Sequence, residues 1–466
     1  MKKYLYAIGM IGLLTLCACG KTPETDQSGS VGAEAGSGAQ KPDETGQKND
    51  GEATEPQDLV PLVLDANAYC NTQEGYYYIT EDTVELRDGT YGSRLMYMDF
   101  ATQQEVYLCS DAGCSHDDES CSAVLCDDEF VWGSSRVFIW NGSLYILSKE
   151  SDDDGVVSID YLSGEPQEAK SMPAALYQMD LDGTNRKKVF TFEDGITLED
   201  CILADSDSLY FVSKKLETNV EKSVSVTNST DRKIIRLTPS ESSFETVQSL
   251  NFDDGVKWQV MGRYDHSLIL QGVIYPDGFE ASPNLDDDAW REGYLNSRSV
   301  YAVLDLVSGE LTQVYQIENR DIHSSANRDG ILYISSEEGG RIEKIDLRTG
   351  EQSTLAEILQ GNIVGTFSDT LICRTWNMAD DYTMYFVDTA DGTVSHCGLT
   401  NKYNGWALDI MGETQNDAVV IYDYDADPNL DGSYEIYQYK FALITKEDLL
   451  AGKDNFRPIQ MTGKGI

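Results

Sequence analysis

Short apolar segments with alternating hydrophobicity recur along the chain, each after a turn rich in Asn, Asp, Ser or Gly. They cover 74–82, 141–150, 206–215, 264–274, 328–338, 367–377 and 415–425. Tyr, Val, Ile, Leu and Phe at a period of two favour half-buried strands. Each segment is followed by a strand that runs into a turn and a further strand, as in LYQMDLDGTNRKKVF at 176–190. Repetition of one supersecondary unit constrains the fold more than any other feature of this sequence.

The spacing of the repeats favours a propeller. The equivalent positions Tyr76, Leu144, Leu209, Leu268, Leu332, Leu371 and Val419 lie 39 to 68 residues apart. A bare blade needs about 40–50 residues, so the longer units carry insertions, at 149–173, 216–232 and 276–298. One four-stranded sheet cannot bury both of its faces, and such units therefore stack radially. We predict an all-β fold, a β-propeller with seven blades. Six or eight blades also fit, and a pair of β-sandwiches is the rival fold.

The first residues, MKKYLYAIGMIGLLTLCACGK, indicate export. Lys2 and Lys3 precede an apolar stretch that is too short for a comfortable membrane span. The stretch ends in Leu-Cys-Ala-Cys, which is typical of a lipoprotein signal peptide over residues 1–18 with Cys19 as the lipidated residue. Cys17 is the weaker candidate, because the bulky Leu16 would then lie at the cleavage point. An ordinary signal peptide cut nearby is the alternative.

Composition separates a tether from a folded domain. Residues 20–58 contain no aromatic residue and one branched aliphatic residue, Val31. Such a segment cannot form a core, so we expect a disordered acidic tether over 19–58 and a β-propeller domain over 59–466. The chain has 80 acidic against 35 basic residues and a net charge of −45. This charge disfavours nucleic acid and anionic lipid headgroups as partners. The predicted location is the outer side of the cell membrane, with the lipid anchor as the only membrane attachment.

Four cysteines and a histidine gather in LCSDAGCSHDDESCSAVLC, with the spacing Cys109-x4-Cys114-x-His116-x4-Cys121-x4-Cys126. The first four of these residues offer the soft and borderline ligands of a tetrahedral zinc site. The acidic residues at 117–119 are expected to orient the imidazole. Disulfides are the leading interpretation of the same cysteines, because eight cysteines, an even number, follow the predicted lipidated Cys19 of an exported chain. A redox or catalytic thiol is a third interpretation, weakened by the absence of a Cys-x-x-Cys pair.

A second acidic motif near the C-terminus predicts a calcium site. Oxygen ligands stand at loop positions 1, 3, 5, 7 and 9, supplied by Asp427, Asn429, Asp431, the Ser433 carbonyl and Glu435. Gly432 allows the sharp turn that such a loop needs. The motif departs from an EF-hand where Gln438 replaces the bidentate glutamate. A solvated acidic turn is the alternative, because Asp, Asn and Gly are also turn formers.

The lipobox, the polar tether, the LYQMDLDGTN type of unit and the LCSDAGCSHDDESCSA segment together resemble a family. They are similar to the extracytoplasmic β-propeller lipoproteins of anaerobic gut Firmicutes, which carry a propeller domain of unknown function distantly similar to that of TolB. The resemblance covers roughly 59–466. It implies a fold and an extracytoplasmic location, and it implies no established activity.

Familiar catalytic motifs are absent from the sequence. The four histidines form no metalloprotease pair, and neither a Gly-x-Ser-x-Gly elbow nor a Walker loop occurs. We therefore predict a surface-anchored lipoprotein whose propeller is a non-catalytic binding module for an extracellular glycan, peptide or protein partner. The alternative is an extracytoplasmic hydrolase or lyase that acts on carbohydrate or cell-wall material, with a site assembled from several blades. Zinc and calcium are the candidate cofactors, and no organic cofactor is expected.

The insertion at 276–298 offers candidate ligand contacts in Phe279, Trp290, Arg291 and Tyr294. Aromatic faces near carboxylates suit a sugar or a cationic peptide. The alternative is that this insertion packs its own aromatic residues together and only covers the fourth blade.

Overall fold

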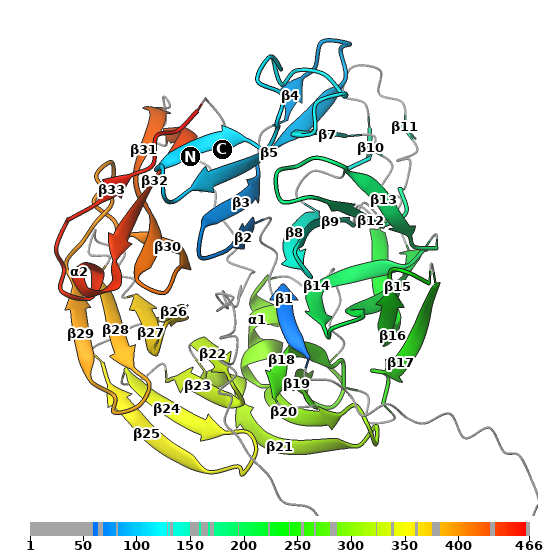
Figure 1. The fold of residues 1–466 in the computed structure, drawn as a ribbon. Coiled ribbons are helices and arrows are strands. Elements are labelled where there is room, and N and C mark those ends of the chain that lie inside the picture. Colours follow the sequence, from blue (N-terminus) through cyan, green and yellow to red (C-terminus); the bar gives the residue numbers. More distant parts are fainter. Residues whose placement is uncertain are drawn as a thin grey trace, which may run out of the picture.

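The structure of the protein is a computed structural model, and the predicted seven-bladed propeller is confirmed by seven β-sheets in a ring (Figure 1). The structure describes residues 59–63, 69–80, 83–127, 129–130, 134–149, 158–159, 166–167, 172–193, 195–221, 224–241, 243–252, 256–264, 267–279, 287–322, 324–336, 340–358, 362–374, 383–428 and 434–462. The predicted signal peptide, Cys19 and the predicted tether lie outside these residues. No described helix is long and apolar enough to cross a membrane.

The first three blades carry additional strands. Blade 1 contains β2 (Tyr69–Asn71), β3 (Gly75–Ile79), β5 (Tyr91–Asp99) and β6 (Gln104–Tyr107), and β4 (Val84–Glu85) and β7 (Val124–Cys126) also pair with β5. Blade 2 contains β8 (Ser135–Trp140), β9 (Ser143–Ser148), β12 (Ala175–Met179) and β13 (Lys187–Thr191), beside a short hairpin of β10 (Ser158–Ile159) and β11 (Pro166–Gln167). Blade 3 contains β14 (Thr197–Ala204), β15 (Leu209–Glu221), β16 (Val224–Thr238) and β17 (Ser243–Ser249), and β1 (Val60–Val63) adds an inner fifth strand.

The last four blades have four strands each. Blade 4 contains β18 (Gln259–Tyr264), β19 (Ser267–Ile274), β20 (Arg298–Asp305) and β21 (Leu311–Glu318), with α1 (Asp287–Leu295) before β20 and the 3-10 helix η1 (Asn319–Asp321) after β21. Blade 5 contains β22 (Ser324–Arg328), β23 (Ile331–Ser335), β24 (Arg341–Asp346) and β25 (Gln352–Glu357). Blade 6 contains β26 (Asn362–Phe367), β27 (Thr370–Arg374), β28 (Met384–Asp388) and β29 (Val394–Cys397). Blade 7 contains β30 (Asp409–Glu413), β31 (Asp417–Pro428), β32 (Tyr434–Thr445) and β33 (Arg457–Pro458), with α2 (Lys446–Leu450) before β33.

Tight turns explain why strands follow each other so closely. Asn141 and Gly142 have φ of 48° and 73°, and Asp329 and Gly330 have φ of 48° and 76°. Two consecutive residues with positive φ make the turn that matches the twist of a two-residue hairpin. The sequence predicted a turn of Asn, Asp, Ser or Gly before each of these strands. The insertion predicted at 216–232 extends β15 and β16 into a longer hairpin.

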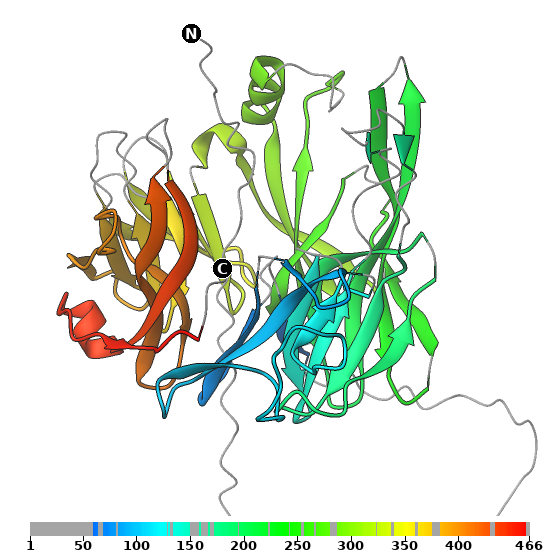
Figure 2. The same ribbon diagram turned by 90° about the horizontal axis from the view of Figure 1, so that it is seen from above.

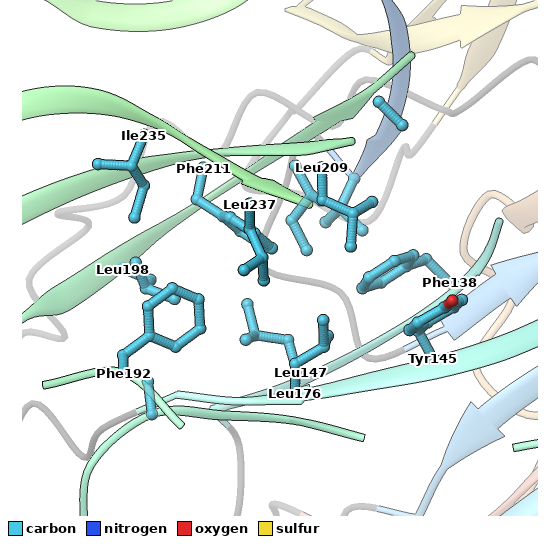
Figure 3. Packing of buried hydrophobic residues seen from close by; sticks show 14 of the residues in the cluster. Phe138, Tyr145, Leu147, Leu176, Phe192, Leu198, Leu209, Phe211, Ile235 and Leu237 are labelled. Carbon is cyan, nitrogen blue, oxygen red and sulfur yellow. The ribbon is translucent and has the colours of Figure 1, made fainter. Parts of the chain in front are cut away.

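The hydrophobic core is divided among the spaces between blades. Seven clusters of buried residues each join two consecutive blades, and the last joins blade 7 to blade 1. Figure 3 shows the cluster between blades 2 and 3, where Phe138 and Leu147 face Leu209 and Phe211. A blade therefore buries its two faces against two different neighbours, which explains the continuous burial of inner strands such as β9.

The segment after β33 closes the ring by reaching from blade 7 to blade 1. Each described strand belongs to a single sheet. Gln460 forms a parallel bridge with Gln104 on the outer strand of blade 1. The Glu105 N–H donates to the Gln460 carbonyl at 2.9 Å, and the Gln460 N–H donates to the Gln103 carbonyl at 2.8 Å. The Thr462 N–H donates to Glu105 Oε2 at 2.7 Å. These contacts hold the C-terminal segment across blade 1.

The ring has two unlike faces. On the turn face, the first strand of each blade turns into the second, and the third turns into the fourth. On the loop face lie the links between blades and the longer connections between second and third strands, including α1 and the tip of the β15–β16 hairpin. In Figure 2 the helix α1 and the green tips of β15 and β16 project from the same side. Binding residues concentrate on variable connections of this kind.

Candidate metal centre

The link after β6 folds back onto β5 and brings the cysteines together. At its start, the Leu108 N–H donates to the Leu95 carbonyl at 3.0 Å. At its end, the Leu95 N–H donates to the Ala123 carbonyl at 2.8 Å. Cys109 and Cys121 lie next to these two anchoring points. The pairing of both ends with one β5 residue therefore closes the link into a compact loop at the outer edge of blade 1.

Four of the five predicted residues converge in this loop. Their ligand atoms all lie within 4.8 Å of one another, for Cys109, Cys114, His116 and Cys121. The Nδ1 atom of His116 lies 3.3 Å from the Sγ atom of Cys121. Cys126 is not part of this group, and it lies at the end of β7, where it pairs in register with Gly92 of β5. None of the eight described cysteines forms a disulfide.

Each cysteine of the cluster accepts a hydrogen bond from the backbone two residues further on. The His116 N–H donates to Cys114 Sγ at 3.4 Å. The backbones of Asp111 and Ala123 interact in the same way with Cys109 and Cys121. Amide donors aimed at a sulfur atom stabilise its thiolate form, which is the form that binds metals. The local backbone therefore directs one N–H group at each of the three sulfur atoms.

Burial acts differently on the individual ligands. Burial raises the pKa of Cys121 to about 12. Burial also acts to raise the pKa of Cys109, but hydrogen bonds from the Asp111 backbone and from neighbouring side chains outweigh it, and the pKa is lowered. Burial and the nearby positive charge of Arg94 lower the pKa of His116. The imidazole is therefore held in the neutral form, which a metal ligand requires.

Arg94 on β5 supplies the matching charge. Its Nη1 atom is buried and has no hydrogen-bond partner among the described residues. Burial lowers the pKa of Arg94, and the charges of Tyr107, Cys121 and Asp117 act in the opposite direction. A zinc ion bound by three thiolates and a neutral imidazole carries one net negative charge. An arginine that is otherwise costly to bury fits beside such a group, so the residues present fit zinc.

The imidazole is positioned by an aromatic ring. The Tyr107 ring stacks on His116 at a centroid distance of 4.3 Å. The acidic neighbours that we expected to orient the imidazole contact other groups: Asp117 accepts from Arg87 at 2.7 Å, and Asp118 accepts from the Ser120 N–H at 2.9 Å.

The other predicted sites are only partly covered by the structure. Asp427, at the end of β31, is exposed and pairs in register with Glu435. The other calcium candidates Asn429, Asp431 and Ser433, together with the side chain of Glu435, lie outside the described residues. The calcium site remains a prediction.

In the blade 4 insertion, Phe279 stacks on Tyr275 at 5.1 Å and fits tightly against Gly293 of α1. Burial raises the pKa of Tyr294. Arg291 is exposed, and the side chain of Trp290 is not described. Phe279 therefore takes part in internal packing, as the alternative interpretation of this insertion expected.

Sequence reasoning missed several residues on the loop face. Tyr403 and Trp406 are 40% and 43% exposed in the link between β29 and β30. The ring of Tyr403 meets Tyr424 edge-on at 6.2 Å. Arg320 on η1 lines a pocket together with Arg291. In the sequence these residues are marked only by their position in the links between blades. That position becomes informative once the strands are assigned to blades.

No protein-family description and no curated protein matches this chain. Solved structures with a similar fold include a puromycin hydrolase, 10% identical with a TM-score of 0.47, where the match covers 88% of this chain and 54% of that one. An acylaminoacyl peptidase from Pyrococcus horikoshii is 10% identical with a TM-score of 0.43, over 87% and 52% of the two chains. TolB from Acinetobacter baumannii is 11% identical with a TM-score of 0.32, over 81% and 77%. This chain thus spans about half the length of the two hydrolases, and the likeness concerns the fold alone.

Proposed function

We propose that this protein is a lipid-anchored, extracytoplasmic lipoprotein whose propeller is a non-catalytic binding module for an extracellular glycan, peptide or protein partner. The observation that carries the proposal is the asymmetry of the ring. Long connections and exposed aromatic side chains gather on the loop face, whereas the described connections of the turn face are mostly short turns, with α2 as the longer one. A rigid ring with variable connections on one side is a common platform for ligand binding.

The direction of β1 supports the outward orientation of the loop face. β1 is antiparallel to β14, and Val60 pairs with Ala204, the last residue of β14 before the turn at 205–208. Val63 pairs with Ile202, further from that turn. The chain therefore enters the ring from the turn face. If Cys19 carries the lipid, the turn face is directed toward the membrane and the loop face toward the extracellular space.

Exposed aromatic side chains on the loop face offer contact area for a ligand. Tyr403 and Trp406 lie close in sequence, and Asp409 follows at the start of β30. Aromatic faces beside hydrogen-bonding groups suit the apolar faces of sugars and the side chains of peptides. The turn face has exposed apolar residues too, but they are scattered: Leu181 and Val307 sit on separate hairpin turns, and Leu450 sits on α2.

The test uses the purified full chain on glycan and peptide arrays. We expect binding to be lost in the double variant Tyr403→Ala, Trp406→Ala, because truncating an aromatic contact at the centre of an interface costs about 2 kcal/mol or more. The double variant Leu181→Ala, Val307→Ala removes comparable exposed apolar groups from the turn face and serves as the control. Equal losses in both variants, or full binding in the first, would reject the loop face as the binding surface. Cleavage of a bound glycan would favour the hydrolase or lyase alternative.

We also propose that Cys109, Cys114, His116 and Cys121 hold a structural zinc ion. Four protein ligands fill a tetrahedral shell and leave no open position for a substrate, so the ion would cross-link the loop and supply no chemistry of its own. Arg94 would balance the charge of the thiolates, and Tyr107 would fix the imidazole. The zinc content of the purified chain, and its dependence on His116, tests this proposal.

A further inference from the structure

A pocket on the loop face collects positive charge in a strongly acidic protein. It lies between the end of α1 and η1, has a volume of about 390 Å³ and is open to solvent. Its lining residues are Arg291, Glu292, Leu295, Asn296 and Arg320. Both arginines are exposed. With 80 acidic residues in the chain, a pocket with two guanidinium groups and one carboxylate is an exception to the prevailing charge.

The two arginines differ from most others in their pairing. Nine arginines of the described part form ion pairs with carboxylates, namely Arg87, Arg136, Arg232, Arg236, Arg328, Arg341, Arg348, Arg374 and Arg457. Arg291 and Arg320 have no described carboxylate within 4.0 Å. Arg320 Nη2 donates to Asn296 Oδ1 at 3.1 Å, which leaves its other N–H groups available. Guanidinium groups present their donors in a fork that matches a carboxylate or phosphate.

A buried hydrogen-bond network fixes the geometry of the pocket. Asn319, which is 1% exposed, donates through Nδ2 to Ser297 Oγ at 2.6 Å and accepts at Oδ1 from Ser299 Oγ at 2.6 Å. Its N–H also donates to the Ser297 carbonyl at 2.9 Å. Ser297 Oγ in turn lies 2.6 Å from the Tyr294 carbonyl at the end of α1. The network ties the end of α1 to η1, so Arg320 is held beside Asn296 by residues that are themselves fixed.

We propose that this pocket binds the free C-terminal carboxylate of a short peptide. Arg291 and Arg320 would hold the carboxylate, Glu292 would accept the N–H of the terminal residue, and Leu295 would contact its side chain. The inference deepens the proposed binding function and rests on it. A peptide is favoured over an acidic sugar because no described residue lining the pocket offers an aromatic face on which a sugar ring would stack. Capture of a terminal carboxylate is an established mode of peptide recognition.

The experiment measures binding of labelled tetrapeptides to the full chain. The set varies the last residue over the twenty amino acids, and each peptide is made with a free and with an amidated C-terminus. We expect at least one free-acid peptide to bind, with a loss of about 30-fold in affinity for its amide. Arg291→Gln and Arg320→Gln should each weaken binding about tenfold. Arg348→Gln makes the same charge change on the turn face and should leave the affinity unchanged.

Each of the following outcomes would contradict the inference. Equal binding of acids and amides would show that the carboxylate is not recognised. An equal loss of peptide affinity in Arg348→Gln would reveal a general charge effect. If inorganic phosphate displaced the labelled peptide as effectively as an unlabelled free-acid peptide does, the pocket would be an unspecific anion site. Binding of an oligogalacturonate in the absence of peptide binding would overturn the ligand class. If array ligands depend on Tyr403 and Trp406 but not on Arg291 or Arg320, the proposed function survives while this inference fails.

Discussion

The substitution His116→Ala separates zinc from disulfides at the cysteine cluster, because it removes a metal ligand and leaves every cysteine in place. The cross-linked loop runs from Cys109 to Cys121. A zinc ion that binds the folded loop but not the unfolded chain stabilises the fold by about 2.7 kcal/mol when its free concentration is about 100 times its dissociation constant. With an unfolding entropy of about 2.1 cal/mol/K per residue over about 400 residues, this free energy corresponds to a fall in Tm of about 3 to 4 °C. The zinc hypothesis therefore predicts that decrease for His116→Ala.

The assay combines thermal unfolding with intact mass measurement of the full chain, in native buffer and then denatured without reductant. The wild type should carry one zinc ion in the native state and free thiols after denaturation. His116→Ala should lose the zinc ion. Cys126→Ser is the matched control, because Cys126 lies outside the cluster, and it should keep both the zinc ion and the Tm. A denatured wild type that lacks the hydrogens of paired thiols, with His116→Ala melting like the wild type, would refute the zinc centre and establish a disulfide staple.

Three further predictions concern stability. Calcium at about 1 mM should raise the Tm relative to chelator, and Asp427→Ala should abolish the rise; an identical melting curve with and without calcium would rule out the site. Burial acts to raise the pKa of Glu413, but hydrogen bonds from Lys446 and Ser368 and the charge of Lys446 lower it, so its stabilising effect should be present at neutral pH and lost as the pH falls below about 4. Glu413→Gln should lower the urea midpoint at neutral pH and reduce its acid dependence, whereas an unchanged pH profile would show that the group does not contribute. Truncation after Pro458 should cost about 3–5 kcal/mol, because it removes the closing hydrogen bonds and the buried Ile459, and truncation after Thr462 should cost little.

The sequence predicted the fold because propeller strands are local units. Period-two apolar segments and turns such as Asn141-Gly142 describe each hairpin without reference to the rest of the chain. The closing segment was not predictable in this way. Its contact with Gln104 joins residues from opposite ends of the domain, and no local pattern marks Gln460 as the partner.

The candidate metal centre was predicted only in part, because sequence patterns reveal local groups of residues but not contacts between distant segments. Four ligands within a short segment are visible as a spacing, but the exclusion of Cys126 depends on the pairing of β7 with β5. Arg94 belongs to a different strand and becomes relevant only because its charge interacts with Cys121 and His116 in the folded chain. Arg291 was identified as a candidate from the insertion at 276–298. Arg320 was not, because Asn319 positions it near Arg291 through contacts that exist only when η1 packs against the end of α1.

The position of β1 determines how a pulling force would enter the protein. A pull on the chain before Val60 acts along the axis of a strand that is hydrogen-bonded side by side to β14 at the inner edge of blade 3. The hydrogen bonds of an antiparallel pair lie perpendicular to the strands, so this load shears them together instead of opening them one after another. Leu59 and Val63 anchor the same strand in two different interblade cores. Under a pull from this end the protein would resist separation of β1 from β14, and its outer strands would carry little of the load.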